Sequence, residues 1–371
     1  MFLVLYVLFC LGWGLAATEM MDPFGKPIGY DFMAFWSASR VALDGAPLDA
    51  YDPTRLFLAQ QGALPALTMP FLWHYPPTFY LAVLPLALLP YFWSYVVFTA
   101  LTLGVYWGVV RRIVPQAGAG MLFLAFPGVF VNAFHGQNAF LTGALLGATL
   151  LLLERRPLLA GVCAGLLAIK PHLAVLLPIA FICMGAWRAL FAAALTALVF
   201  LGVSVAVMGD GTLHAFISNL RLVRLIMESG WLPWIKMPTF FAFAKLLGAP
   251  TAFAYALQAI GALAVIACVA WIWRQAVDYR LKAAGLVSGT LLVSPYLFDY
   301  DLALLALPLA WYGMYGLRSG WRRGECEIVA LCWTLPGLVA PLAKTDIQMA
   351  PFVLFLMLAM IVWRVQTDKR T

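Results

Sequence analysis

The stretch from Gly29 to Pro53, GYDFMAFWSASRVALDGAPLDAYDP, combines carboxylates with aromatic residues just after the first hydrophobic run of the chain. Asp31, near its start, is the first candidate for chemistry. A carboxylate at the start of a helix is both positioned and kept ionised. In that state it can accept a proton from a hydroxyl group, as a general base does. The same place also suits a simple helix N-cap, so both interpretations of Asp31 stay open.

A second residue of this kind is Lys170, in the segment IKPH between two hydrophobic runs. Placing the charged side chain of a lysine inside a membrane costs free energy, so a lysine within apolar sequence predicts a functional site. The alternative is a lysine at an outer helix end that extends its ammonium group to water. His172, two residues later, is a weaker candidate because a lone histidine at a helix start is more often structural.

The composition shows what surrounds these residues. The 371 residues are 64% hydrophobic and 11% charged, with a mean hydropathy of +0.93. Such a chain is predicted to be an all-α polytopic integral membrane protein. The net charge of +7 does not indicate nucleic acid, because the basic residues adjoin hydrophobic runs and act there as orientation signals.

A bilayer core of roughly 30 Å requires about 20 apolar residues per helix. Dividing the chain at charges, prolines and glycines predicts about twelve transmembrane helices. The runs lie near 2–17, 79–110, 118–134, 138–153, 157–169, 172–187, 189–208, 251–273, 283–297, 301–316, 326–342 and 348–364. Within 79–110, Pro85 and Pro90 predict a membrane-proximal helix followed by the true crossing.

Most basic residues, including Arg111, Arg155 and Arg274, fall in short loops on one side, and most acids fall on the other. The positive-inside rule then makes both termini cytoplasmic and leaves 18–78 and 209–250 as outer loops, with the first run retained as a span. The setting we expect is a bacterial inner membrane with the site facing outward. The cysteines form neither a disulfide framework nor a CxxC metal pattern.

Within the first outer loop, residues 32–43 have helical spacing. We predict an amphipathic helix on the outer membrane surface, with Asp31 at its N-cap and Gly45 ending it. One predicted face carries Phe32, Phe35, Trp36 and Leu43, and the other carries Met33, Ser37, Arg40 and Asp44.

Three phrases, YDFMAFWSASRVALDGAPLDAYDP, HYPPTFYLAVLPLALLP and HGQNAFLTGALLGATLLLLERRPLLAGVCAGLLAIKPHLAVLLP, with a weaker echo in SPYLFDYDLALLALP, resemble glycosyltransferase family 87. This resemblance implies a GT-C fold and transfer of a sugar, mannose-like, from a polyprenyl phosphate to a hydroxyl acceptor on a glycolipid or polysaccharide. It implies that Asp31 is the general base of an inverting single displacement. We predict a single integral membrane domain over 1–371, in which the resemblance implies a catalytic module over 1–208 and a variable helical module over 209–371.

The resemblance suggests roles for further residues. Lys170 with Arg221 or Arg224, three residues apart on a predicted helix, could contact the lipid phosphate, although the two arginines also suit interfacial anchors. The remaining candidates are polar residues that could bind substrate or only cap helices and turns: His74, Tyr75, His135, Gln137, Asn138, His172, Asp299 and Asp301. Related sequences often carry a histidine near Asp299, and this chain does not. We predict no metal and no cofactor, since no ligand spacing demands one.

Two other functions remain possible at this stage. A membrane transporter would show matching broken helices in two halves and polar residues near the bilayer midplane, whereas the polar residues here gather at one face. An O-antigen-type polymerase or ligase would carry its largest arginine-bearing loop late in the chain, whereas the largest outer loop here is the first.

Overall fold

The computed structural model describes residues 2–368, and these contain helices and no β-strand. The α-helices are α1 (Phe2–Ala16), α2 (Phe32–Leu43), α3 (Pro53–Ala63), α4 (Pro77–Val83), α5 (Tyr91–Ile113), α6 (Ala119–Leu124), α7 (Pro127–His135), α8 (Ala139–Leu152), α9 (Pro157–Leu166), α10 (Leu176–Met184), α11 (Trp187–Met208), α12 (Gly211–Glu228), α13 (Phe240–Leu246), α14 (Thr251–Trp273), α15 (Tyr279–Val293), α16 (Ala306–Ser319), α17 (Glu325–Ala343) and α18 (Ala350–Asp368). The 3-10 helices are η1 (Pro47–Tyr51), η2 (Leu84–Leu88), η3 (Leu167–Ile169), η4 (Pro171–Leu173), η5 (Trp234–Lys236) and η6 (Asp299–Leu305).

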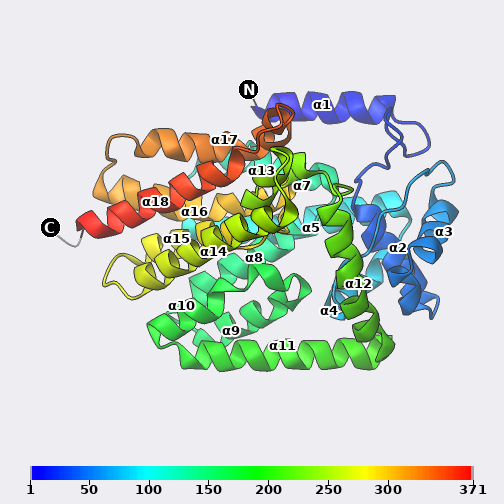
Figure 1. Ribbon diagram of the computed structural model, residues 1–371, viewed down its shortest axis with the longest axis horizontal. Helices are drawn as coiled ribbons and strands as arrows, with labels where there is room; N and C mark the ends of the chain where they lie inside the picture. The colour runs from blue at the N-terminus through cyan, green and yellow to red at the C-terminus, as the bar shows by residue number, and fades with distance from the viewer. Residues whose placement is uncertain (1, 369–371) are drawn as a thin grey trace.

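Long helices run along the longest axis of the molecule, with α11 at one edge and α1 at the opposite edge (Figure 1). Within 2–368, five helices are long and apolar enough to cross a membrane, namely α5, α11, α14, α17 and α18. The chain is therefore a helical membrane protein, but the twelve crossings expected from the sequence are not confirmed. Several apolar runs form helices too short to cross alone. For example, α8 has 14 residues, which is about 21 Å against the roughly 30 Å of a bilayer core.

Prolines divide the apolar runs. The run 79–110 contains α4 and η2, then a break at Pro90, then α5 from Tyr91, as Pro85 and Pro90 predicted. The run 118–134 is not one helix, because Pro127 begins α7 after the short α6. A proline fits the first turn of a helix, where its missing N–H leaves no bond unmade.

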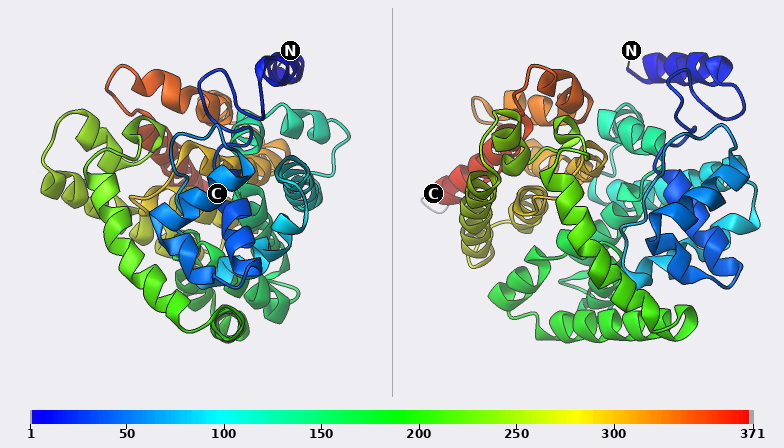
Figure 2. Two further views of the ribbon diagram at one scale, coloured as in Figure 1. Left: turned by 90° about the vertical axis from the view of Figure 1, so that its right-hand side faces the viewer. Right: turned by 45° about the vertical axis from the view of Figure 1, so that its right-hand side comes forward.

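Residues 18–88, which we call the cap segment, cover one end of the long helices (Figure 2). The cap segment has its own apolar cluster, in which Phe32 and Phe35 of α2 pack against aromatic rings of the following chain. Helix α2 spans the predicted residues, and Gly45 after it has φ +82°. Its predicted place on the membrane surface is wrong, because Met33 and Ser37 are as buried as Phe32 and Phe35. Protein covers both faces of α2 over most of its length, whereas Arg40 and Leu43 near its C-terminal end are exposed.

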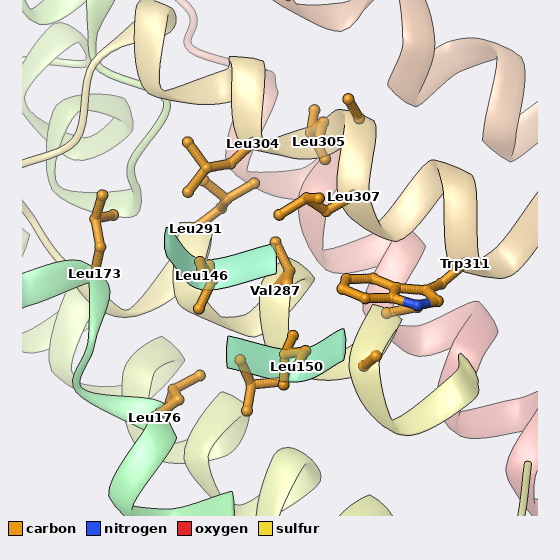
Figure 3. Close-up of a cluster of buried hydrophobic side chains, with 14 of the residues drawn as sticks. Leu146, Leu150, Leu173, Leu176, Val287, Leu291, Leu304, Leu305, Leu307 and Trp311 are labelled. Atoms are coloured by element: carbon orange, nitrogen blue, oxygen red, sulfur yellow. The ribbon is translucent and has the colours of Figure 1, made fainter. Parts of the chain in front are cut away.

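The main apolar core joins the early and late parts of the chain. In Figure 3, Leu146 and Leu150 of α8 lie among Val287 and Leu291 of α15 and Trp311 of α16. Leu173 and Leu304 belong to the same core. These two leucines each follow a charged residue by three positions, Lys170 and Asp301. The core therefore anchors the two segments that carry this lysine and this aspartate.

Helices α9 and α11 cross at close range. A Cβ at Gly161 would lie 2.5 Å from the Ala189 carbonyl oxygen, and one at Gly165 would lie 2.6 Å from that of Ala193. Only hydrogen fits at these two positions, since real Cβ contacts are not this short. The two glycines let the backbones approach, as small residues do between membrane helices.

The segment predicted as the second outer loop, 209–250, is largely helical. It contains α12 and α13, and between them the irregular part includes the short η5. Pro233 and Pro238 flank η5, where the sequence predicted irregular chain. Helix α12 crosses the direction of the long helices beside the cap segment (Figures 1 and 2).

Candidate active site around Asp31

The turn between α7 and α8 is the base on which the site is built. Gly136 ends α7 with φ +62°, and a Cβ there would meet the Phe32 Cβ at 2.6 Å. The buried Asn132 holds the turn from both sides: its Nδ2 donates to the Gln137 carbonyl at 3.1 Å, and its Oδ1 accepts from the Ala139 N–H at 3.1 Å. Glycine is needed at position 136 because α2 approaches so closely.

Asp31 is fixed to this turn through its backbone. Its N–H donates to the His135 carbonyl at 3.1 Å. Gly29, two residues earlier, has φ +81° and lies under the ring of Tyr95, so a side chain would not fit. Asp31 occupies the N-cap position of α2, but its carboxylate makes no capping hydrogen bond. The carboxylate therefore does not cap the N-terminus of α2, as the capping interpretation required.

Instead, the Asp31 carboxylate accepts a hydrogen bond of 3.0 Å from Gln137 Nε2. The orientation of this amide follows from its other partners. Gln137 Oε1 accepts from the Tyr75 hydroxyl at 3.0 Å and from the Asn138 N–H at 3.3 Å. A backbone N–H can only donate and a carboxylate can only accept, so the oxygen must face Asn138 and the nitrogen must face Asp31.

Lys170 reaches the site because the chain breaks there. Pro171 cannot continue a helix and disfavours helical geometry at the residue before it, and Lys170 has φ −147° and ψ 69°. The Thr78 hydroxyl donates to the freed Ala168 carbonyl at 2.8 Å. The tip between η3 and η4 is thereby tied to α4, and Lys170 lies at that tip.

The Lys170 ammonium is buried and paired. It forms an ion pair with Asp301 and donates to Asn138 Oδ1 at 3.4 Å. The two charged side chains are 5% and 1% exposed. Asp301 also accepts from the Phe298 N–H at 3.3 Å, so it both caps η6 and neutralises the lysine. The ring of Tyr300 lies against Lys170, with 5.1 Å from Nζ to the ring centroid.

A second lysine lies on the other side of Tyr300. Lys236 Nζ is 3.0 Å from His135 Nε2, and the His135 ring is 5.7 Å from that of Tyr300. Asp299 is buried nearby and accepts from the Tyr300 N–H at 2.9 Å. Burial raises the pKa of the Asp299 carboxyl, and the nearby His135 and Lys236 act in the opposite direction.

Several buried polar atoms near the site have no protein partner: His74 Nδ1, Asn138 Nδ2 and His172 Nε2. Buried polar groups are almost always satisfied, so such atoms mark places where a substrate or water can bind. Burial lowers the pKa of His74 to about 4, partly countered by the Asp31 carboxylate, so this imidazole is neutral near pH 7. Burial also raises the pKa of the Tyr75 hydroxyl well above its ordinary value, which keeps it a hydrogen-bond donor.

Most of the candidates from the sequence thus gather at one end of the molecule, beside the cap segment. Arg221 and Arg224 form no hydrogen bond or ion pair with the residues around Asp31. Both are exposed on α12, and Arg224 is bound to Glu228 at 2.6 Å and stacks over Tyr255. Helix α12 touches the site region elsewhere, where Asn219 Nδ2 donates to the Trp73 carbonyl at 2.9 Å.

Sequence reasoning missed Asn132 and Tyr300 and did not single out Lys236. Asn132 is a polar residue inside an apolar helix, which is a usable signal. Tyr300 stands between the two aspartates that were noted. Lys236 lies in irregular, proline-flanked chain with no periodicity to show which way it faces.

Among residues 2–368, no three His, Cys, Asp or Glu side chains lie close enough together to hold a metal ion. A cavity of about 410 Å³ lies elsewhere, near Tyr315 and Arg364. Tyr315 is on α16, which continues the helical chain from Asp301. At the rise of a helix, the residues between them span roughly 20 Å. Arg364 there is already bound to Glu325 at 2.9 Å. This cavity is therefore separate from the cluster around Asp31.

The comparisons with known proteins give one family. The sequence profile of glycosyltransferase family 87 matches residues 73–295, which is more than half of the chain. Neither the curated proteins nor the solved structures contain a match.

Proposed function

The chain belongs to glycosyltransferase family 87, and from this premise we propose that it moves a sugar from a polyprenyl phosphate to a hydroxyl acceptor with Asp31 as general base. Membership makes the chain a membrane glycosyltransferase. The donor, the acceptor and the catalytic residues are our proposal.

One observation supports the role of Asp31 above all others. Its carboxylate makes no helix cap and is held by Gln137 Nε2 at 3.0 Å. Within residues 2–368, no other group donates to it. A half-buried, oriented carboxylate with a free oxygen suits proton abstraction, which requires the hydroxyl within about 3 Å.

The proposed reaction is a single displacement. The acceptor oxygen attacks the anomeric carbon while its proton passes to Asp31. The bond between the anomeric carbon and the phosphate oxygen breaks at the same time, and polyprenyl phosphate leaves with the electron pair. Attack opposite the leaving group inverts the anomeric centre. The unpaired atoms of His74, Asn138 and His172 are candidates to bind sugar hydroxyls.

The remaining parts of the proposal concern the setting. We propose an outward-facing site in a bacterial inner membrane, cytoplasmic termini, a mannose-like pentose or hexose, and a glycolipid or polysaccharide as acceptor. The distribution of basic and acidic residues supports the orientation. We propose that neither a metal nor a cofactor takes part, and that nucleic acid is not a partner.

The experiment is a transfer assay with purified protein and a panel of polyprenyl-phosphate sugars. We expect transfer with inverted anomeric configuration, and loss of at least 100-fold in rate in Asp31→Asn. Asp44→Asn is the matched control, because Asp44 ends the same helix and forms only an exposed pair with Arg40. Folding of each variant is checked by its thermal unfolding in detergent. Full transfer by folded Asp31→Asn would remove Asp31 from the mechanism.

The alternative functions give different outcomes. Flux of a solute through proteoliposomes without any transfer would favour a transporter. Transfer of a whole lipid-linked oligosaccharide from a diphosphate carrier, with no use of monophosphate donors, would favour the polymerase or ligase class.

A further inference from the structure

The proposed function needs a cation near the leaving phosphate, and the three candidates from the sequence do not fit this role. Arg221 and Arg224 are exposed on α12 and bond no residue around Asp31. Lys170 is paired with the buried Asp301. Withdrawing it would leave a carboxylate buried without its partner, which is strongly unfavourable. Arg224 is paired with Glu228 on an exposed face. The site therefore needs another positive group, and this inference rests on the proposed function.

Lys236 has hydrogen-bonding capacity that its contacts do not use. Its ammonium is within 3.0 Å of His135 Nε2. His135 Nδ1 is 2.8 Å from the Val131 carbonyl, which can only accept, so Nδ1 carries the proton and Nε2 is a neutral acceptor. An ammonium group has three donors, and this bond uses one of them. His135 therefore holds the Lys236 ammonium in place, and because this imidazole is uncharged it does not neutralise the charge of the lysine.

The segment that carries Lys236 is held in place from several sides. Trp234 Nε1 donates to the Met227 carbonyl at 2.8 Å. The Ile235 carbonyl accepts from the buried Gln348 Nε2 at 3.1 Å. Met237, the next residue after Lys236, is fully buried. The ammonium therefore extends from a fixed short helix, which is what a preorganised binding group requires.

Lys236 also lies next to the groups proposed to react. His135, to which it is bound, accepts the N–H of Asp31 through its carbonyl at 3.1 Å. The ring of Tyr30 is 6.0 Å from the Lys236 ammonium and 5.5 Å from the His135 ring. His135 thus contacts both Asp31, the proposed base, and Lys236.

We propose that Lys236, held by His135, binds the phosphate of the lipid-linked donor and stabilises the negative charge of the leaving group. Its spare N–H groups supply charge-assisted hydrogen bonds to phosphate oxygens. Such bonds strengthen as charge develops on the leaving oxygen.

A purely electrostatic role is the competing explanation, because the buried Asp299 lies near Lys236 and His135. In that case Lys236 would serve to compensate a carboxylate and would not touch the donor. Asp299→Asn separates the two roles. If compensation were the function, removing the negative charge would make Lys236 dispensable, and Lys236→Gln would have no effect in the Asp299→Asn background.

The test measures binding of polyprenyl phosphate, the proposed product, to purified protein without any transfer. We expect Lys236→Gln to weaken binding by about tenfold to a hundredfold, with Lys236→Arg recovering most of it. In the transfer assay the KM for the donor should rise while the KM for the acceptor stays unchanged. Lys282→Gln is the control, because Lys282 lies in the first turn of α15, at the end of that helix away from Asp299, and its nearby charge is Glu154.

The outcomes can be told apart. Unchanged binding of polyprenyl phosphate by Lys236→Gln overturns this inference even if transfer by the wild type is confirmed. Binding that depends on Lys236, without transfer of any sugar, supports it and removes the proposed function. Competition by phosphatidylglycerol vesicles at equal phosphate would show a site for phospholipid headgroups and overturn the assignment to the donor.

Discussion

The side-chain amide of Gln137 donates a 3.0 Å hydrogen bond to the Asp31 carboxylate across 106 residues of sequence. Tyr75 and the backbone of Asn138 leave the amide only one orientation. We therefore expect Gln137 to position the proposed base without touching the substrate.

Gln137→Ala is expected to lower kcat by about tenfold to a hundredfold, since small errors in the placement of a base cost this much. The KM for the donor should change little, because Lys236, the proposed phosphate contact, is bound to His135 and not to Gln137. The measurement is steady-state kinetics of sugar transfer. Gln61→Ala is the control, since Gln61 lies on α3 and its side chain donates to the Leu67 carbonyl at 3.2 Å, away from Asp31. A change confined to KM would contradict the positioning role.

The ion pair of Lys170 and Asp301 gives a second prediction. Lys170→Met and Asp301→Asn each leave one charge buried without its partner, and each should destabilise the protein by about 3–5 kcal/mol. The double variant Lys170→Met/Asp301→Asn should recover most of this loss, because it removes both charges and an asparagine can still accept from the Phe298 N–H. Denaturant unfolding in detergent measures all three. As the reference, the exposed pair of Arg40 and Asp44 should contribute about 0–1 kcal/mol. Additive losses in the double variant would contradict the pairing.

The sequence allowed part of this site to be predicted. Aromatic spacing predicted α2 correctly over residues 32–43. The sequence also predicted Asp31 and Lys170 on one face of the membrane; in the structure both reach the turn between α7 and α8, Asp31 through Gln137 and Lys170 through Asn138. The burial of α2 could not be predicted, because its polar face consists of residues such as Ser37 that fit a protein interior as well as a membrane surface. Ser37 satisfies its hydroxyl within the helix, on the Met33 carbonyl.

The number of crossings is not confirmed, for a related reason. A helix buried inside a membrane protein and a helix facing lipid are equally apolar, so hydropathy does not distinguish α8, which is mostly buried, from α11, which is mostly exposed. The ion pair between Lys170 and Asp301 also could not be predicted from the sequence. Asp301 lies 131 residues away, and its local sequence predicts only a helix cap.

His74 gives a prediction about pH. Burial lowers its pKa from 6.5 to about 4. Between these two values the unfolded chain binds a proton that the folded protein does not, so the free energy of unfolding should fall as the pH falls through this window and then level off below about 4. His74→Gln should remove this component, on the order of 3 kcal/mol at most. Denaturant unfolding of both proteins across the window measures the difference, and parallel curves would contradict it.

The crossing of α9 and α11 gives the last prediction, and it connects packing with the site. Gly165 lies five residues before Lys170, and even a methyl group there would meet the Ala193 carbonyl and the Thr196 side chain at 2.6 Å. Gly165→Ala should therefore push α9 from α11, destabilise the protein by about 1–3 kcal/mol, and lower transfer by moving Lys170. Gly202→Ala on α11 is the matched control, because nothing lies within 4 Å of a Cβ there, and better helix propensity should make it neutral or stabilising by up to about 1 kcal/mol. Thermal unfolding and transfer rates are measured for both variants. Equal behaviour of the two would mean that the close approach does not hold the Lys170 segment in place.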